Sequence, residues 1–243
     1  MIRPSVFSMT HVSPEESLER YKNEMGEELG SIFYHLLREA FYITSIWEQY
    51  ELLFETPERI NLLNDSCGYF FSSVQRSFFD YTLLGVCRLT DPPKMGKYDN
   101  LTVQCLPPMV RDSIRSQVES CVKTAVSKSD FCRDWRNKKI AHNDLARKMV
   151  GTPLASATRK SVTDALIAIH NVLRIPALEY CRSDLIFVPI NVDDIMHLLY
   201  NLYYGQRYEE ERTERAKQGI WDGPDRVPEW LHIDWSEQLK KYE

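Results

Sequence analysis

The sequence has few glycines and no long apolar run, and both shortages narrow the class of protein. Nine glycines among 243 residues leave little of the turn chemistry on which β-rich folds depend. No stretch reaches the roughly 18 apolar residues of a membrane span, and the N-terminal Met1-Ile2-Arg3-Pro4-Ser5 lacks the apolar segment of a secretory signal. We therefore expect a soluble, cytoplasmic protein without a membrane partner.

A strong basic excess is also missing. The chain has 30 Lys and Arg against 35 Asp and Glu, a net charge of −5, whereas proteins that coat nucleic acid nonspecifically are usually strongly basic. Any contact with RNA must therefore be local, and we expect no DNA partner.

Motifs for metals and nucleotides are absent as well. The sequence contains no Gly-x-Gly-x-x-Gly, Walker loop, His-Glu-x-x-His or Gly-x-Ser-x-Gly motif. Without a Cys-x-x-Cys pair, the cysteines are predicted to be reduced core thiols, at Cys67, Cys87, Cys105, Cys121, Cys132 and Cys181. Five dispersed histidines are predicted to be surface or hydrogen-bonded core residues, at His11, His35, His170, His197 and His232. We expect neither a metal nor a cofactor.

Helix signals are plentiful. Ser13-Pro14-Glu15-Glu16 forms a capping box, and apolar residues then recur every three or four positions to about Phe54, with Gly26 and Gly30 placed to bend or break the helix. Thr56-Pro57-Glu58 is a second start signal. From about Ser66 to Leu89 the chain is apolar on nearly every side, which predicts a helix in the middle of a bundle that ends before Pro92. Arg76 and Asp80, four apart, can pair on its one polar stripe.

The rest of the chain follows the same pattern. We expect an irregular connection over 92–107, helices over about 108–127 and 129–147, a loop over 151–157, a helix marked by Val162 to Leu173 that Pro176 kinks or restarts, and a last helix capped by Asn191. Strand alternation is scarce outside 185–190. The sequence predicts an all-α protein with an up-and-down four-helix core and extra helices.

Two regions differ in character. Residues 1–204 are predicted to form the helical bundle, whereas 205–243 form a charged extension with no apolar stripe. Trp221, Trp230 and Trp235 lie in that extension, and we expect them to dock on the bundle or on a partner.

The most informative segment is a basic island that runs from Arg133 to Lys148. It has six Lys or Arg against two Asp, a local charge of +4. Within it, Arg136 and Asn137 precede His142. A guanidinium is a permanently charged fork for phosphate oxygens and an imidazole titrates near neutral pH, so this pair can bind a phosphodiester and move a proton beside it.

Arg136-Asn137, four further residues and His142 resemble the Arg-x(4–6)-His signature of the HEPN superfamily, and the sequence from Arg136 to Asp144 is most similar to its AbiU2-like branch. The ending Arg88-Leu89-Thr90-Asp91 also resembles a recurrent feature of that branch. The resemblance extends from about residue 15 to about 203. It implies an all-helical fold, and many similar proteins are RNA-cleaving toxins or abortive-infection effectors, whereas others have lost activity.

The resemblance implies cleavage of RNA by its own 2′-hydroxyl, without a metal. Arg136 and His142 would be catalytic and Asn137 would orient His142 or the phosphate, while Arg133, Lys138 and Lys139 would attract phosphates. The products would be a 2′,3′-cyclic phosphate and a 5′-hydroxyl.

Spacing adds an expectation about assembly. On a regular helix Arg136 and His142 lie about 120° apart and about 9 Å along the axis, so they do not converge on one atom. Either the long Arg136 side chain or a local distortion closes the gap, or a second copy contributes its own motif. The family resemblance implies that a second copy contributes its motif, so that the cleft is shared in a homodimer.

Two functions remain open at this point. One is an endoribonuclease with RNA as substrate and an antitoxin protein as a further partner. The other is a non-catalytic helical module that binds RNA or a protein, in which His142 is a structural residue and Arg136 pairs with Asp134 or a neighbouring Glu.

Overall fold

The computed structural model describes residues 13–140, 153–185 and 192–220, and helices dominate them. The elements in order are α1 (Pro14–Met25), α2 (Glu27–Leu53), α3 (Pro57–Thr90), β1 (Lys94–Met95), β2 (Tyr98–Asp99), the 3₁₀ helix η1 (Val103–Cys105), α4 (Asp112–Lys128), α5 (Asp130–Trp135), the π-helical η2 (Arg136–Ile140), α7 (Arg159–Cys181) and α8 (Val192–Lys217). The all-α prediction is confirmed.

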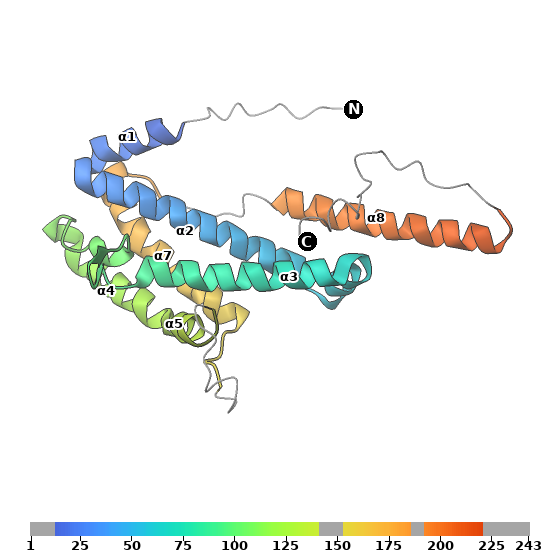
Figure 1. The fold of residues 1–243 in the computed structure, drawn as a ribbon. Coiled ribbons are helices and arrows are strands. Elements are labelled where there is room, and N and C mark those ends of the chain that lie inside the picture. Colours follow the sequence, from blue (N-terminus) through green and yellow to red (C-terminus); the bar gives the residue numbers. More distant parts are fainter. Residues whose placement is uncertain (1–12, 141–152, 186–191, 221–243) are drawn as a thin grey trace, which may run out of the picture. The chain divides into compact units, whose positions relative to one another are not determined.

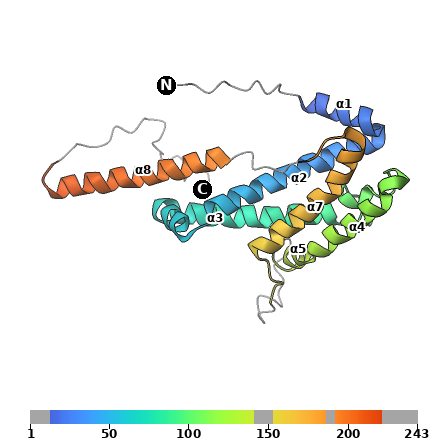
Figure 2. The ribbon, with the colours of Figure 1, turned by 180° about the vertical axis from the view of Figure 1, so that it is seen from behind.

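Four long helices make the core. As Figures 1 and 2 show, α2 packs antiparallel to α3, α4 packs along α7, and α7 also contacts α2. The centre is built from fully buried side chains on α2, α3 and α7, among them Phe33, Leu36, Ile43, Leu83, Val86, Ile169 and Leu173. Helix α1 folds back onto α2, and the short α5 and η2 pack against α3.

Gly26 separates the first two helices. The capping box at Ser13 is present, with Glu16 N donating to Ser13 Oγ over 3.1 Å and Ser13 N donating to Glu16 Oε2 over 2.8 Å. Helix α1 ends at Gly26, whose φ of +91° lies in a region that L side chains rarely adopt. A Cβ on Gly30 would collide with the backbone of Tyr21. The two glycines therefore allow the chain to turn and the helices to pack closely.

Helix α3 is buried over only part of its length. Leu83, Val86 and Leu89 are fully buried, but Tyr69 and Phe70 are 92% and 61% exposed. The expectation that this segment is enclosed on nearly every side is therefore wrong in its first half. The α3 range contains a kink at Cys67, where φ is −153° and ψ is +63°, so Tyr69 and Phe70 directly follow a break in the regular helix and are not covered as Leu83 is.

The connection after α3 is more ordered than predicted. It contains a short antiparallel hairpin in which Met95 pairs with Tyr98. Thr102 Oγ1 donates to Leu89 O over 2.9 Å and Gln104 Nε2 donates to Thr90 O over 2.8 Å. These bonds satisfy carbonyls that the end of a helix leaves without partners. The connection is thereby fixed to the C-terminal end of α3.

Helix α7 continues through Pro176 as one element, so the predicted restart does not occur. Thr158 caps its start in a capping box with Ser161. His170 is 8% exposed and its Nε2 lies 2.8 Å from Thr44 Oγ1 of α2. This confirms the hydrogen-bonded core role expected for that histidine. Among the cysteines, only Cys87 and Cys132 are buried, and Cys67 is exposed, so the prediction of core thiols holds for two of the six.

Helix α8 extends past the position where the charged extension was expected to begin, because it runs to Lys217 without a break at Tyr204. Arg207 and Glu211, one turn apart, form an ion pair of 3.5 Å on it. The boundary at residue 204 stays a prediction. Asn191, residues 186–190 and the three C-terminal tryptophans lie outside the described residues. No helix in the described ranges is long and apolar enough to cross a membrane.

Candidate functional site

The basic island begins on a distorted helix. Helix α5 ends at Trp135, and Arg136–Ile140 continue as a π-helical turn. π-helical turns are rare in proteins, and a large share of them lie at functional sites. The angular arithmetic of a regular helix therefore does not hold over Arg136–Ile140. His142 lies outside the described residues.

Arg136 is bound at two of its three nitrogens. Its Nη1 lies 2.5 Å from Asp91 Oδ2, and its Nε donates to Asn137 Oδ1 over 3.1 Å. The side chain is 22% exposed. Within the described part of the chain, Nη2 makes no hydrogen bond. Among the described residues, the ion-pair partner of Arg136 is therefore Asp91 and not Asp134 or a Glu.

Arg133 binds the same carboxylate from the other side. Its Nε lies 3.4 Å from Asp91 Oδ1, and its Nη2 donates to Thr90 O over 2.7 Å and to Thr90 Oγ1 over 3.0 Å. Asp91 is 9% exposed. One buried carboxylate at the end of α3 thus joins two arginines of the island, and an RNA contact by Arg133 stays a prediction.

The two lysines have partners on α5. Lys138 Nζ lies 2.5 Å from Asp134 Oδ1, and Lys139 Nζ lies 4.3 Å from the centre of the Trp135 ring. Trp135 Nε1 donates to Ala155 O and Ala155 N donates to Asp134 Oδ2, both over 2.8 Å. The chain beyond the undescribed segment 141–152 is thereby bound to the start of the island.

The spacing of Arg76 and Asp80 allowed an ion pair, and the structure does not form it. Oδ1 of Asp80 is buried and has no hydrogen-bond partner among the described residues. Burial raises the pKa of Asp80, while the charges of Lys139 and Arg76 act in the opposite direction. A carboxylate with a raised pKa therefore lies next to the island, which the sequence did not indicate.

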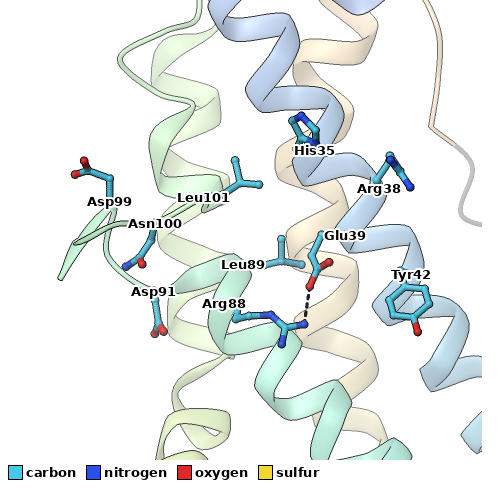
Figure 3. A pocket seen from close by; sticks show the side chains of 10 residues that line it. All are labelled: His35, Arg38, Glu39, Tyr42, Arg88, Leu89, Asp91, Asp99, Asn100 and Leu101. Atoms are coloured by element: carbon cyan, nitrogen blue, oxygen red, sulfur yellow. Dashed lines mark hydrogen bonds and ion pairs between the residues drawn. The ribbon is translucent and has the colours of Figure 1, made fainter. Parts of the chain in front are cut away.

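A groove lies beside this network. It has a volume of about 610 Å³ and extends between α2, the end of α3 and the hairpin connection (Figure 3). We call it the α2–α3 groove, and its walls include His35, Arg38, Tyr42, Arg88, Asp91 and Asn100. Asp91 therefore belongs both to the groove and to the ion-pair network of Arg136.

A comparison with known families decides the identity of this bundle. The family model HEPN_AbiU2, described as AbiU2, matches residues 26–174. The chain belongs to the AbiU2 family of HEPN domains. The match covers α2 to α5, η2 and most of α7 of this HEPN domain, which confirms the resemblance noted in the sequence. Comparisons with curated proteins and with solved structures found no match.

Asp91 was not among the site residues predicted from the sequence, although the sequence contained one signal for it. The ending Arg88 to Asp91 was noted as similar to the AbiU2-like branch, but nothing in the order of residues links Asp91 to Arg136, 45 positions later. The structure brings Arg133 and Arg136 together at Asp91, and Asn137 contacts Arg136. Lys138 and Lys139 point to other partners, on α5.

Proposed function

We propose that this HEPN domain is a metal-independent endoribonuclease of the abortive-infection or toxin type. The observation that carries the proposal is the state of Arg136. Asp91 and Asn137 fix two nitrogens of its guanidinium, and the third is left without a partner in the described part of the chain. A positively charged donor that is held in place before substrate binds is what an electrostatic catalyst requires.

The chemistry needs little else. The 2′-hydroxyl of RNA attacks the neighbouring phosphorus, the 5′-oxygen leaves, and a 2′,3′-cyclic phosphate forms. His142 accepts the proton of the 2′-hydroxyl, because an imidazole has a pKa near the working pH. Arg136 stabilises the charge on the non-bridging oxygens through charge-assisted hydrogen bonds. Lys138 and Lys139 attract the phosphates of the RNA.

A homodimer completes the proposed site. One His142 per chain cannot conveniently act as base and acid in the same step, whereas two copies facing one cleft supply both. HEPN domains commonly dimerise and bind RNA, which supports this assembly. The cytoplasm is the compartment in which such an enzyme would meet its substrate.

The test is cleavage of structured RNA in EDTA. The wild-type protein should release products with 2′,3′-cyclic phosphate ends, and His142→Ala or Arg136→Ala should reduce the rate by at least about 100-fold. Two matched controls should cleave normally. Arg174→Ala removes an arginine from another Arg–Asp pair, with Asp184, and His197→Ala removes an exposed histidine. Equal cleavage by all four variants would refute the assignment.

A second candidate is a non-catalytic module that binds RNA or a protein such as an antitoxin. It is favoured by the ion pairs themselves, because Arg133 and Arg136 share Asp91 and Lys138 pairs with Asp134. Such pairs also occur where charges only stabilise a fold. Expression separates the two candidates: the enzyme should arrest growth and His142→Ala should relieve the arrest, whereas the module should leave growth unchanged.

A further inference from the structure

The α2–α3 groove carries a different charge at each end. Arg38 of α2 lies at one end and Asp99 and Asn100 of the hairpin connection lie at the other (Figure 3). Between them, Arg88 is paired with Glu39 over 2.6 Å and donates to Tyr81 OH over 3.4 Å. The groove therefore presents a cationic end and an end that accepts hydrogen bonds.

Arg38 is the arginine of the groove that is open to a ligand. Its Nη1 donates to Tyr34 OH over a long 3.4 Å, and its guanidinium carbon lies 5.6 Å from the centre of the Tyr34 ring. No carboxylate pairs with it among the described residues. An exposed guanidinium without a carboxylate is well suited to a phosphate.

Tyr42 supplies an aromatic surface next to Arg38 (Figure 3). It is 56% exposed. The Tyr81 ring meets it at 89° with centroids 5.8 Å apart, which leaves a face of Tyr42 uncovered by Tyr81. Exposed aromatic faces beside cationic side chains are the surfaces on which unpaired bases stack.

We infer that the α2–α3 groove binds an unpaired nucleotide of the RNA substrate, with its phosphate at Arg38 and its base against Tyr42. The inference rests on the proposed function for the identity of the ligand. A nucleotide has an anionic phosphate beside a flat base, which suits Arg38 and Tyr42, because these two side chains lie next to each other on α2 (Figure 3). The volume of about 610 Å³ lies within the range of small-ligand sites.

Asp91 links the groove to the proposed chemistry. Its carboxylate pairs with Arg136, and it also lines the groove. RNA whose scissile phosphate meets Arg136 would pass Asp91 to enter the groove. The groove and Arg136 therefore contact the same RNA strand at two separate points.

Binding is measured on the full chain carrying His142→Ala, so that RNA stays intact. A fluorescein-labelled single-stranded RNA is titrated and its anisotropy is recorded over a range of salt concentrations. Arg38→Ala and Tyr42→Ala should each raise Kd by about 5- to 10-fold, and Tyr42→Phe, which keeps the ring, should bind like the parent. Arg38→Ala should also reduce the slope of log K against log salt by about 0.7.

Arg111→Ala is the matched control. Arg111 also lies over a tyrosine ring, 4.5 Å from the centre of Tyr180, but does not line the groove, so its loss should leave Kd unchanged. Circular dichroism of each variant verifies folding, and the comparison of Tyr42→Ala with Tyr42→Phe keeps backbone and charge constant.

The outcomes separate this inference from the nuclease proposal. RNA binding that depends on Arg38 and Tyr42, without cleavage by the wild type, would refute the nuclease and support the groove. Cleavage by the wild type with Kd unchanged in both groove variants would refute the groove alone. Three further results would overturn the groove assignment. They are no RNA binding by the His142→Ala chain, a rise in Kd for Arg111→Ala equal to that of the groove variants, and equal Kd values for the single strand and the matching duplex.

Discussion

Asp91 is the residue outside the signature that binds two arginines of the basic island. It ends α3, is nearly buried, and receives both Arg133 and Arg136. A buried carboxylate that joins two guanidinium groups limits where those groups can lie, since displacing either one leaves a charge without its partner. In the proposed enzyme, Asp91 would therefore act through Arg136 as a positioning residue.

Replacement of Asp91 by Asn tests this role. The amide keeps the shape but loses the charge, so we expect a loss of about 1 to 3 kcal/mol in the free energy of unfolding. In the RNA cleavage assay kcat should fall at least about 10-fold, because Arg136 is no longer held in one orientation. Asp112→Asn is the control, since Asp112 pairs with Arg115 at an exposed position. Normal kcat in Asp91→Asn would contradict the positioning role.

His170 makes stability depend on pH. Burial lowers its pKa from 6.5 to about 3, so the folded protein holds this imidazole neutral while the unfolded chain binds a proton below pH 6.5. Stability is therefore present above pH 6.5 and is lost as pH falls toward 3, by up to about 1.4 kcal/mol per pH unit. Urea unfolding between pH 6.5 and 5 should show this slope in the wild type and in His35→Gln, which replaces an exposed histidine. His170→Gln should lose it.

At the scale of elements, close packing of α2 on α3 positions everything that follows. Gly85 of α3 faces Ile43 of α2, and a Cβ on Gly85 would lie 2.5 Å from Ile43 Cδ1. This close contact lies less than two turns before Asp91 at the end of α3. Helix α5 and η2 then pack on the side of α3, where the Phe79 and Trp135 rings lie 5.2 Å apart.

Gly85→Ala should consequently destabilise the fold. The added methyl group forces α2 and α3 apart or moves Ile43 from its rotamer, at a cost of about 1 to 3 kcal/mol. Gly68→Ala in the same helix is the control, because a Cβ there would meet only Asn64 Oδ1 at 3.9 Å. In thermal or urea unfolding, the Gly85→Ala variant should be clearly less stable than the Gly68→Ala variant. Equal stability of the two variants would show that this helix contact is looser than described.

At the scale of the whole molecule, the proposed enzyme needs two chains. Light scattering should give twice the 28.5 kDa of one chain at assay concentrations. If both motifs form one cleft, mixing wild-type chains with an excess of His142→Ala chains should reduce activity more steeply than dilution alone, because mixed dimers carry only one intact motif. A mass of 28.5 kDa together with full activity would exclude the shared cleft.

Much of the fold followed from local patterns. Four local signals predicted helices that the structure contains: the capping box at Ser13, the start at Thr56, the stop before Pro92 and the periodic apolar positions. They were reliable because each signal acts within about one turn of the chain. The exposed part of α3 was missed because burial depends on neighbours that a sequence pattern does not reveal. The continuation of α8 to Lys217 was missed because a charged helix without an apolar stripe has no periodic signal.

The sequence alone determined the helical class, the place of the basic island and the family resemblance carried by Arg136, Asn137 and His142. The tertiary structure decided that Arg136 starts a π-helical turn, that its partner is Asp91 and that a groove adjoins both. The reason is distance along the chain. Capping and periodicity join residues three or four positions apart, whereas an ion pair between residues 91 and 136 exists only after α3 and α5 have packed.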